Sequence, residues 1–74
     1  MHTITLLEPI HEHGIRLLES RARVQRLSGP ADPALGAALA DSDALVVRST
    51  PVGAEILDLG PKLRVIGRHG AGTD

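Results

Sequence analysis

The stretch that decides the fold is Ala44-Leu45-Val46-Val47, which runs directly into Arg48-Ser49-Thr50-Pro51. The first four residues form a continuous apolar run with no polar face. Such a run is typical of a central strand in a parallel sheet, because helices cover both faces of that strand. The polar residues that follow it would then lie at the carboxyl end of the sheet.

Strand-like and helix-like segments alternate upstream of this run. We expect strands over residues 3–7 and 23–27, the second as a half-exposed edge strand, with an amphipathic helix over residues 10–20 between them. Ser28-Gly29-Pro30 indicates a turn. A second helix is expected to begin at Asp32-Pro33 and to continue through Ala40, because Asp is favoured as an N-cap and Pro at the first helical position.

The alternation continues downstream. A third helix is expected to be capped by Ser49 or Thr50, with Pro51 near its start, and to stop at Gly60-Pro61. A fourth strand is expected over residues 63–66. The predicted order is β-α-β-α-β-α-β, which indicates an α/β domain with a parallel sheet and right-handed crossovers.

Composition narrows the possible functions. The 74 residues include no Cys, Phe, Tyr or Trp, and the net charge is −1. The core must therefore be aliphatic, and there is neither a disulfide framework nor a thiolate metal site. Nucleic-acid binding is not expected without aromatic platforms or positive charge. No apolar run approaches the roughly 18 residues of a membrane helix, so we expect no membrane partner. The cysteine-free, Ala- and Arg-rich composition indicates a cytoplasmic location.

The carboxyl ends of the last two expected strands carry the groups that favour anions. Open parallel sheets bind ligands at this edge. Arg48 could grip a carboxylate or phosphate, with the Ser49 and Thr50 hydroxyls and the N–H groups of the following helix as further donors. In Gly70-Ala71-Gly72 a ligand could approach the backbone closely. The alternatives are a solvated surface arginine and an ordinary terminal turn.

Other polar residues carry weaker signals. His11 and His13 lie two residues apart on the expected helix and do not share a face, so no metal site is predicted. Glu8 is interpreted as a solvated or capping carboxylate. The glycines at residues 70 and 72 do not form a dinucleotide fingerprint, because no helix follows them.

Residues 44–52, 54–57 and 61–74, which include Pro61-Lys62-Leu63-Arg64-Val65-Ile66-Gly67-Arg68-His69-Gly70-Ala71-Gly72-Thr73-Asp74, closely resemble the D-isomer-specific 2-hydroxyacid dehydrogenases. Within that family the chain is most similar to the D-3-phosphoglycerate dehydrogenase-like branch. The resemblance is strong from about Asp41 to Asp74 and looser over the first forty residues.

This resemblance implies a flavodoxin-like substrate domain, of which residues 1–74 would be an incomplete part with about four strands. An NAD-binding Rossmann domain would lie outside this chain. The resemblance also implies binding of a small 2-hydroxy or 2-oxo acid, with 3-phosphoglycerate as one candidate. The implied substrate-binding residues are Arg48, Ser49, His69, Gly70, Ala71 and Gly72.

The same resemblance implies that the chemistry is hydride transfer to or from NAD. The Arg, Glu and His that catalyse it in the family would lie beyond Asp74, so no catalytic residue is expected here. His69 is not the catalytic histidine, and Ala71 offers NAD only a backbone contact. The expected partners are the remainder of the dehydrogenase and, in the full-length family, further copies in a homo-oligomer.

Three hypotheses follow for the chain itself. It is the substrate-binding part of an NAD-dependent dehydrogenase and is inactive alone. Alternatively, it is a stand-alone module that binds small carboxylates. A third reading is an interaction module whose unpaired strand edge associates with another chain. A phospho-acceptor receiver domain is disfavoured, because the third expected strand ends in Arg48 rather than in an aspartate.

Overall fold

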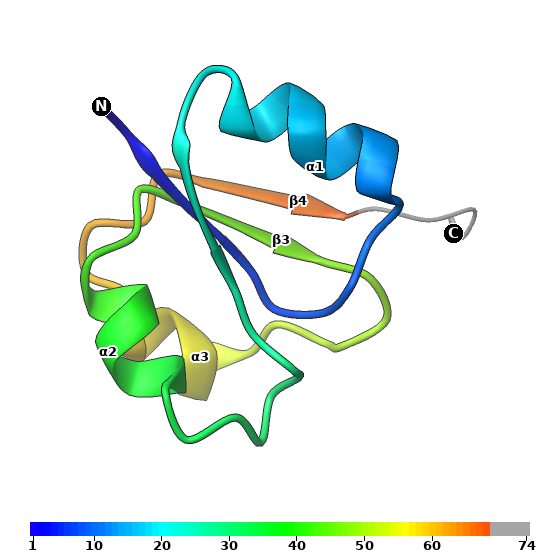
Figure 1. The fold of residues 1–74 in the computed structure, drawn as a ribbon. Coiled ribbons are helices and arrows are strands. Elements are labelled where there is room, and N and C mark those ends of the chain that lie inside the picture. The colour runs from blue at the N-terminus through cyan, green and yellow to red at the C-terminus, as the bar shows by residue number, and fades with distance from the viewer. Residues whose placement is uncertain (69–74) are drawn as a thin grey trace.

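The structure is a computed structural model that describes residues 1–68 of the chain. Within these residues, four strands form one sheet in which every pairing is parallel (Figure 1). The α/β fold class, predicted as a flavodoxin-like parallel sheet of about four strands with flanking helices, is confirmed. The elements follow one another as β1 (Thr3–Leu6), α1 (Glu12–Glu19), β2 (Arg23–Arg26), α2 (Leu35–Ala40), β3 (Ala44–Val47), α3 (Ala54–Leu59) and β4 (Val65–Arg68).

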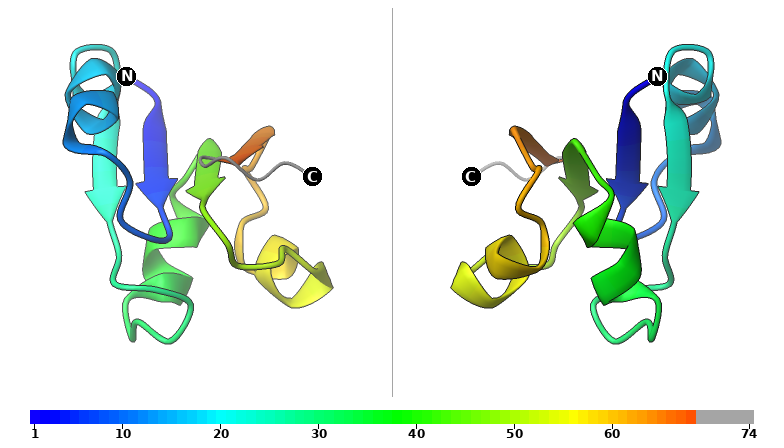
Figure 2. Two further views of the ribbon diagram at one scale, coloured as in Figure 1. Left: turned by 90° about the vertical axis from the view of Figure 1, so that its right-hand side faces the viewer. Right: turned by 90° about the vertical axis from the view of Figure 1, so that its left-hand side faces the viewer.

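The strand order in the sheet is β2-β1-β3-β4. The chain therefore moves outward from β1 to β2, crosses back over β1 to β3, and then moves outward again to β4. Because crossovers are right-handed, α1 and the pair α2 and α3 must lie on opposite faces. Figures 1 and 2 show the sheet between them. The topological switch point consequently falls between β1 and β3.

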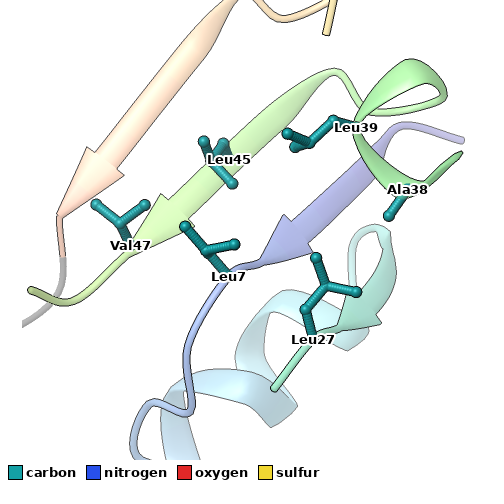
Figure 3. Packing of buried hydrophobic residues seen from close by; sticks show 6 residues of the cluster. All are labelled: Leu7, Leu27, Ala38, Leu39, Leu45 and Val47. Carbon is teal, nitrogen blue, oxygen red and sulfur yellow. The ribbon is translucent and has the colours of Figure 1, made fainter. Parts of the chain in front are cut away.

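The main core lies between the sheet and the face that carries α2 and α3. Its centre is formed by side chains from three of the strands or their ends and from α2, and Leu7, Leu39 and Leu45 are each 0% exposed (Figure 3). Residues next to and within α3 also contact this cluster. The whole cluster is Leu7, Leu27, Ala38, Leu39, Leu45 and Val47, with Leu35, Val52, Ile56 and Leu63 packed against it.

A small polar cluster is buried beside this core. Thr5 and Ser42, both 0% exposed, are hydrogen-bonded to each other through their hydroxyl groups. Ser42 Oγ also donates to the carbonyl oxygen of Ala38 at 2.6 Å, and Gln25 Nε2 approaches the same carbonyl at 3.4 Å. These bonds join β1, β2 and the end of α2, so each buried hydroxyl has a partner and its burial is not a net penalty.

The two edge strands differ in how they are covered. Helix α1 packs on β2, and Arg26 of β2 forms exposed ion pairs with Glu12 and Glu19 of that helix. On β4, Val65 is 62% exposed and Ile66 is 43% exposed. The prediction of β2 as a half-exposed edge strand is confirmed, whereas β4 is the more exposed edge among the residues that the structure describes.

Several predicted boundaries are wrong, and α1 covers residues 12–19 rather than 10–20. Helix α2 begins at Leu35 rather than at Asp32-Pro33, because the Asp32 carboxylate accepts the N–H of Ala34 and holds a turn there instead. Helix α3 begins at Ala54, with Gly53 as its N-cap, rather than next to Thr50. The fourth strand covers residues 65–68 rather than 63–66.

Other predicted features match the structure. Gly29 lies in the predicted turn and has φ 142°, a conformation that side-chain-bearing residues rarely adopt. Helix α3 ends at Gly60 as expected. Strand β3 is internal, but only one of its faces is fully covered, because Leu45 and Val47 are buried while Ala44 and Val46 are half-buried. Within residues 1–68, no helix has the length and apolar character needed to cross a membrane.

Candidate functional site

The candidate site lies at the carboxyl ends of β1 and β3, which are neighbours in the sheet. The chain leaves β1 through Leu7 and Glu8 toward α1, and leaves β3 through Arg48, Ser49 and Thr50 toward α3. Because these two helices cover opposite faces, the outgoing segments diverge and form the crevice in which open α/β sheets bind ligands.

In this structure the crevice holds the carboxylate of Glu8. Its Oε1 accepts hydrogen bonds from three successive backbone N–H groups, those of Arg48 at 2.7 Å, Ser49 at 2.9 Å and Thr50 at 3.1 Å. Its Oε2 accepts from the Ser49 hydroxyl at 2.9 Å. Successive N–H groups that converge on one point make an anion-binding concavity, or nest. We refer to the backbone of residues 48–50 together with the Ser49 hydroxyl as the β3 nest.

The hydrogen bonds fix the charge of this carboxylate. Partial burial of Glu8 raises its pKa, but the N–H groups of Arg48, Thr50 and Ser49 and the Ser49 hydroxyl outweigh that effect. The pKa of Glu8 falls from 4.5 to about 2 as a result. Hydrogen bonding to the charged form is the cause, so Glu8 stays ionised at neutral pH.

Two arginines stand on the rim next to this nest. Arg48 and Arg68 are both exposed, and they follow or end the neighbouring strands β3 and β4. Arg68 pairs with Val47 in the register, and its guanidinium Nη1 lies 3.4 Å from the carbonyl oxygen of Arg48. Two guanidinium groups at one edge favour an anionic ligand with more than one acceptor oxygen.

The predicted site residues are only partly within the described structure. Arg48 lies on the rim as expected, and the Ser49 hydroxyl donates to Glu8. The expected donors from the first turn of α3 are not at this place, because that helix begins at Ala54. His69, Gly70, Ala71 and Gly72 fall outside the described residues 1–68. Substrate binding by these six residues stays a prediction.

Two residues of this rim, Glu8 and Arg68, are not among those that the sequence predicts as site residues. Glu8 acts as a capping carboxylate, but for the loop after β3 rather than for a helix. Glu8 follows the first expected strand directly. This position predicts a role in the site only when β1 and β3 are known to be neighbours in the sheet. The signal for Arg68 is its position at the end of the fourth strand, which corresponds to the position of Arg48 after the third.

A second feature of this edge is an apolar pocket of about 180 Å³ at the ends of β1 and β2. Leu6, Ile15 and Leu27 supply much of its lining, and Glu8 and Arg26 are its charged members on the strand side.

At the start of α1, His11 Nδ1 accepts the N–H of His13 at 3.1 Å, so His11 caps that helix. Within residues 1–68, no group of three His, Cys, Asp or Glu side chains is placed to hold a metal ion.

The fold and the crevice define an α/β domain with a ligand edge at its switch point, and comparison with known proteins identifies its family. Residues 4–74 match the model of the D-isomer specific 2-hydroxyacid dehydrogenase, catalytic domain. The chain therefore belongs to the D-isomer specific 2-hydroxyacid dehydrogenase family.

Similar proteins carry the name D-3-phosphoglycerate dehydrogenase. The chain is 39% identical to that of Methanocaldococcus jannaschii over 75 aligned positions, which cover 100% of this chain and 14% of the relative. It is 35% identical to that of Mycobacterium leprae over 72 residues, which is 96% of this chain and 14% of the relative. The chain thus spans about 14% of the length of these two relatives.

Solved structures agree with this fold. A crystal structure of a protein from Pyrococcus horikoshii OT3 superposes with a TM-score of 0.83 at 24% identity, covering 100% of this chain and 22% of that one. The NAD+-bound 3-phosphoglycerate dehydrogenase of Entamoeba histolytica superposes with a TM-score of 0.76 at 25% identity, covering 99% of this chain and 27% of that one. The first likeness concerns the fold alone.

Proposed function

We propose that residues 1–74 are a partial substrate-binding domain of an NAD-dependent dehydrogenase that acts on the CH–OH group of D-2-hydroxy acids. The match of residues 4–74 to the family's catalytic domain carries this proposal. The exposed Arg48 and Arg68 at the ligand edge support it, because guanidinium groups suit a carboxylate, with or without a phosphate on the same molecule. The similar D-3-phosphoglycerate dehydrogenases make 3-phosphoglycerate the first ligand to try.

In this proposal NAD is held outside the described residues. A Rossmann unit carries its glycines in the first strand-to-helix turn. Between β1 and α1 this chain has Leu7-Glu8-Pro9-Ile10-His11, which contains no glycine. Residues 1–68 therefore do not fit a dinucleotide, and NAD and the catalytic residues would come from the remainder of the dehydrogenase.

Ligand binding can be tested by NMR on the ¹⁵N-labelled chain titrated with 3-phosphoglycerate and with simpler 2-oxo acids. We expect the Arg48 side chain and residues 70–72 to shift at millimolar ligand. Arg48→Gln should abolish the shifts, whereas Arg64→Gln, an exposed arginine before β4 at the opposite edge of the sheet, should leave them unchanged. The binding proposal fails if none of these signals moves in the unaltered chain.

The purified chain should also show no NAD-dependent oxidation of any 2-hydroxy acid. Detectable turnover would contradict the assignment of catalysis to residues outside this chain. The assay is spectrophotometric detection of NADH, with a complete dehydrogenase of the same family as the positive control.

A second candidate function, an interaction module, is favoured by one observation. Val65 and Ile66 of the edge strand β4 are exposed, and such edges can pair with another chain. Light scattering at high protein concentration tests this. A strictly monomeric chain would count against it, and concentration-dependent association that Val65→Lys removes would support it.

A further inference from the structure

The crevice at the switch point is the place where an α/β sheet binds its ligand, yet here a side chain of the same protein occupies it. All three N–H groups of the β3 nest point to one oxygen of Glu8, and the Ser49 hydroxyl holds the other oxygen. The backbone and hydroxyl donors of the β3 nest are thus already engaged.

We propose that Glu8 is a built-in ligand of the β3 nest that closes it to free carboxylates and positions Arg48, so that anion recognition by this loop runs through the Arg48 side chain. The inference deepens the proposed function, on which it rests for the identity of the recognised anion. The claim that the nest is closed rests only on the four hydrogen bonds of the Glu8 carboxylate.

The position of Glu8 is fixed by what precedes it. Leu7 is 0% exposed in the main core, and its N–H donates to the carbonyl oxygen of Val46 on β3 at 2.9 Å. The carboxylate is therefore tethered next to the nest by two strands that are bonded to each other. A tethered group binds within its own molecule, at an effective concentration that is roughly millimolar for a short flexible tether and is greatest when the tether matches the distance. A small carboxylate in solution would therefore have to compete with a group that is already in place.

The backbone of Arg48 is held from both sides. Its N–H donates to Glu8, and its carbonyl oxygen accepts from the Arg68 guanidinium. These two contacts set the direction in which the exposed Arg48 side chain leaves the loop. Removing the Glu8 carboxylate would leave three converging N–H groups without their acceptor, and the nest would become a site for an external anion.

The test uses sodium acetate as the probe anion and NMR of the ¹⁵N-labelled chain, with sodium chloride at equal ionic strength as the reference. In the unaltered chain, acetate should leave the amide signals of residues 48–50 unmoved. In Glu8→Ala, the same signals should shift in a saturable way, with a midpoint in the millimolar range. Glu12→Ala is the matched control, because Glu12 is an exposed glutamate whose partner is the exposed Arg26, and it should behave like the unaltered chain.

Two results would overturn the proposal. One is a saturable acetate shift of residues 48–50 in the unaltered chain, which would mean that the nest is open. The other is a folded Glu8→Ala variant whose amides do not respond to acetate. If Glu8→Ala does not fold, the unaltered chain decides alone through the pH titration of the Glu8 carboxyl carbon. A midpoint near 2 supports the occupied nest, and a midpoint near 4.5 refutes it.

The outcome is separable from that of the proposed function. If 3-phosphoglycerate shifts the signals of neither the Arg48 side chain nor residues 70–72, the proposed binding of this ligand fails. The acetate experiment would still decide whether Glu8 closes the nest. The positioning role has its own readout. Glu8→Asp, which keeps the charge on a shorter side chain, should regain part of the Arg48 response to 3-phosphoglycerate that Glu8→Ala loses. No regain in a folded Glu8→Asp variant would contradict positioning by the carboxylate.

Discussion

Strands β3 and β4 both begin with two apolar residues but differ in their surroundings. Strand β3 has two neighbours, and Leu45 at its centre is 0% exposed. Strand β4 has one neighbour, and Ile66, the register partner of Leu45, is 43% exposed on the same face of the sheet. Apolar residues in a run thus predict a strand, whereas the place of the strand in the sheet decides how much it contributes to stability.

The largest expected effect separates these two register partners. Leu45→Ala should lower the free energy of unfolding by about 2–5 kcal/mol, because it leaves a cavity in the core. Ile66→Ala should lower it by less than about 1.5 kcal/mol, because water already reaches that side chain. Urea unfolding followed by far-UV circular dichroism measures both, since the chain has no aromatic reporter. Equal losses would mean that β4 is as deeply packed as β3.

The next effect concerns the junction between β1 and β3. Glu8→Gln should lower the free energy of unfolding by about 1 kcal/mol. This value is smaller than that of a fully buried hydrogen bond to a charged group, because the site is partly exposed to solvent. Glu12→Gln, which removes only an exposed ion pair with Arg26, should change it by a few tenths of a kcal/mol at most. A Glu8→Gln variant as stable as the Glu12→Gln variant would show that the negative charge of Glu8 adds nothing net, because the Gln amide oxygen can still accept hydrogen bonds from the N–H groups.

The contribution of Glu8 should also depend on pH. A pKa that is lower in the folded than in the unfolded state gives stability that is fully present above the unfolded value of about 4.5 and is lost as the pH falls through about 2. The unaltered chain should therefore lose more stability between pH 5 and pH 2 than Glu8→Gln does. Thermal unfolding across roughly that range checks this, and parallel curves for the two proteins would refute it.

The pKa values of Asp32 and Asp43 are lowered as well, mainly by the N–H groups of Ala34 and Thr3. Part of the acid sensitivity should therefore remain in the Glu8 variant. It is the difference between the two curves, rather than the steepness of either, that reports on the β3 nest.

The smallest expected change in stability is at the exposed edge. Val65→Lys should leave the free energy of unfolding within about 0.5 kcal/mol of its original value, because the side chain is 62% exposed. It should nevertheless reduce any self-association, since charged residues on an edge strand oppose strand addition. Sedimentation of both proteins over a range of concentrations checks this, and a large loss of stability would place Val65 in a packed environment.

The order of elements can be predicted from the sequence because alternating apolar runs and cap residues are local signals. The fourth strand is misplaced because Leu63, which is apolar enough for a strand, packs against the core instead of joining the sheet. The start of α3 is misplaced as well, and the loop that precedes the helix is held by the Glu8 carboxylate, which accepts the N–H of Thr50 from forty-two residues away. Long-range contacts of this kind leave no local pattern.

The residues of the candidate site also differ in whether the local sequence predicts them. Arg48 can be predicted from its position directly after a buried strand, and the structure places it on the rim of the sheet. Glu8 as the occupant of the crevice cannot be predicted without the strand order, because β1 lies next to β3 rather than next to β2 alone. The strand order in the sheet is thus needed to predict that Glu8 belongs to the site.

The parallel sheet has a kinetic consequence. Each of its pairings joins segments that are separated by a crossover, and the central one aligns Ile4 with Ala44. Folding must therefore close long loops before any strand contact forms, and chains with such distant contacts fold slowly for their size. Refolding followed by stopped-flow circular dichroism should be slower than that of helical bundles of similar length.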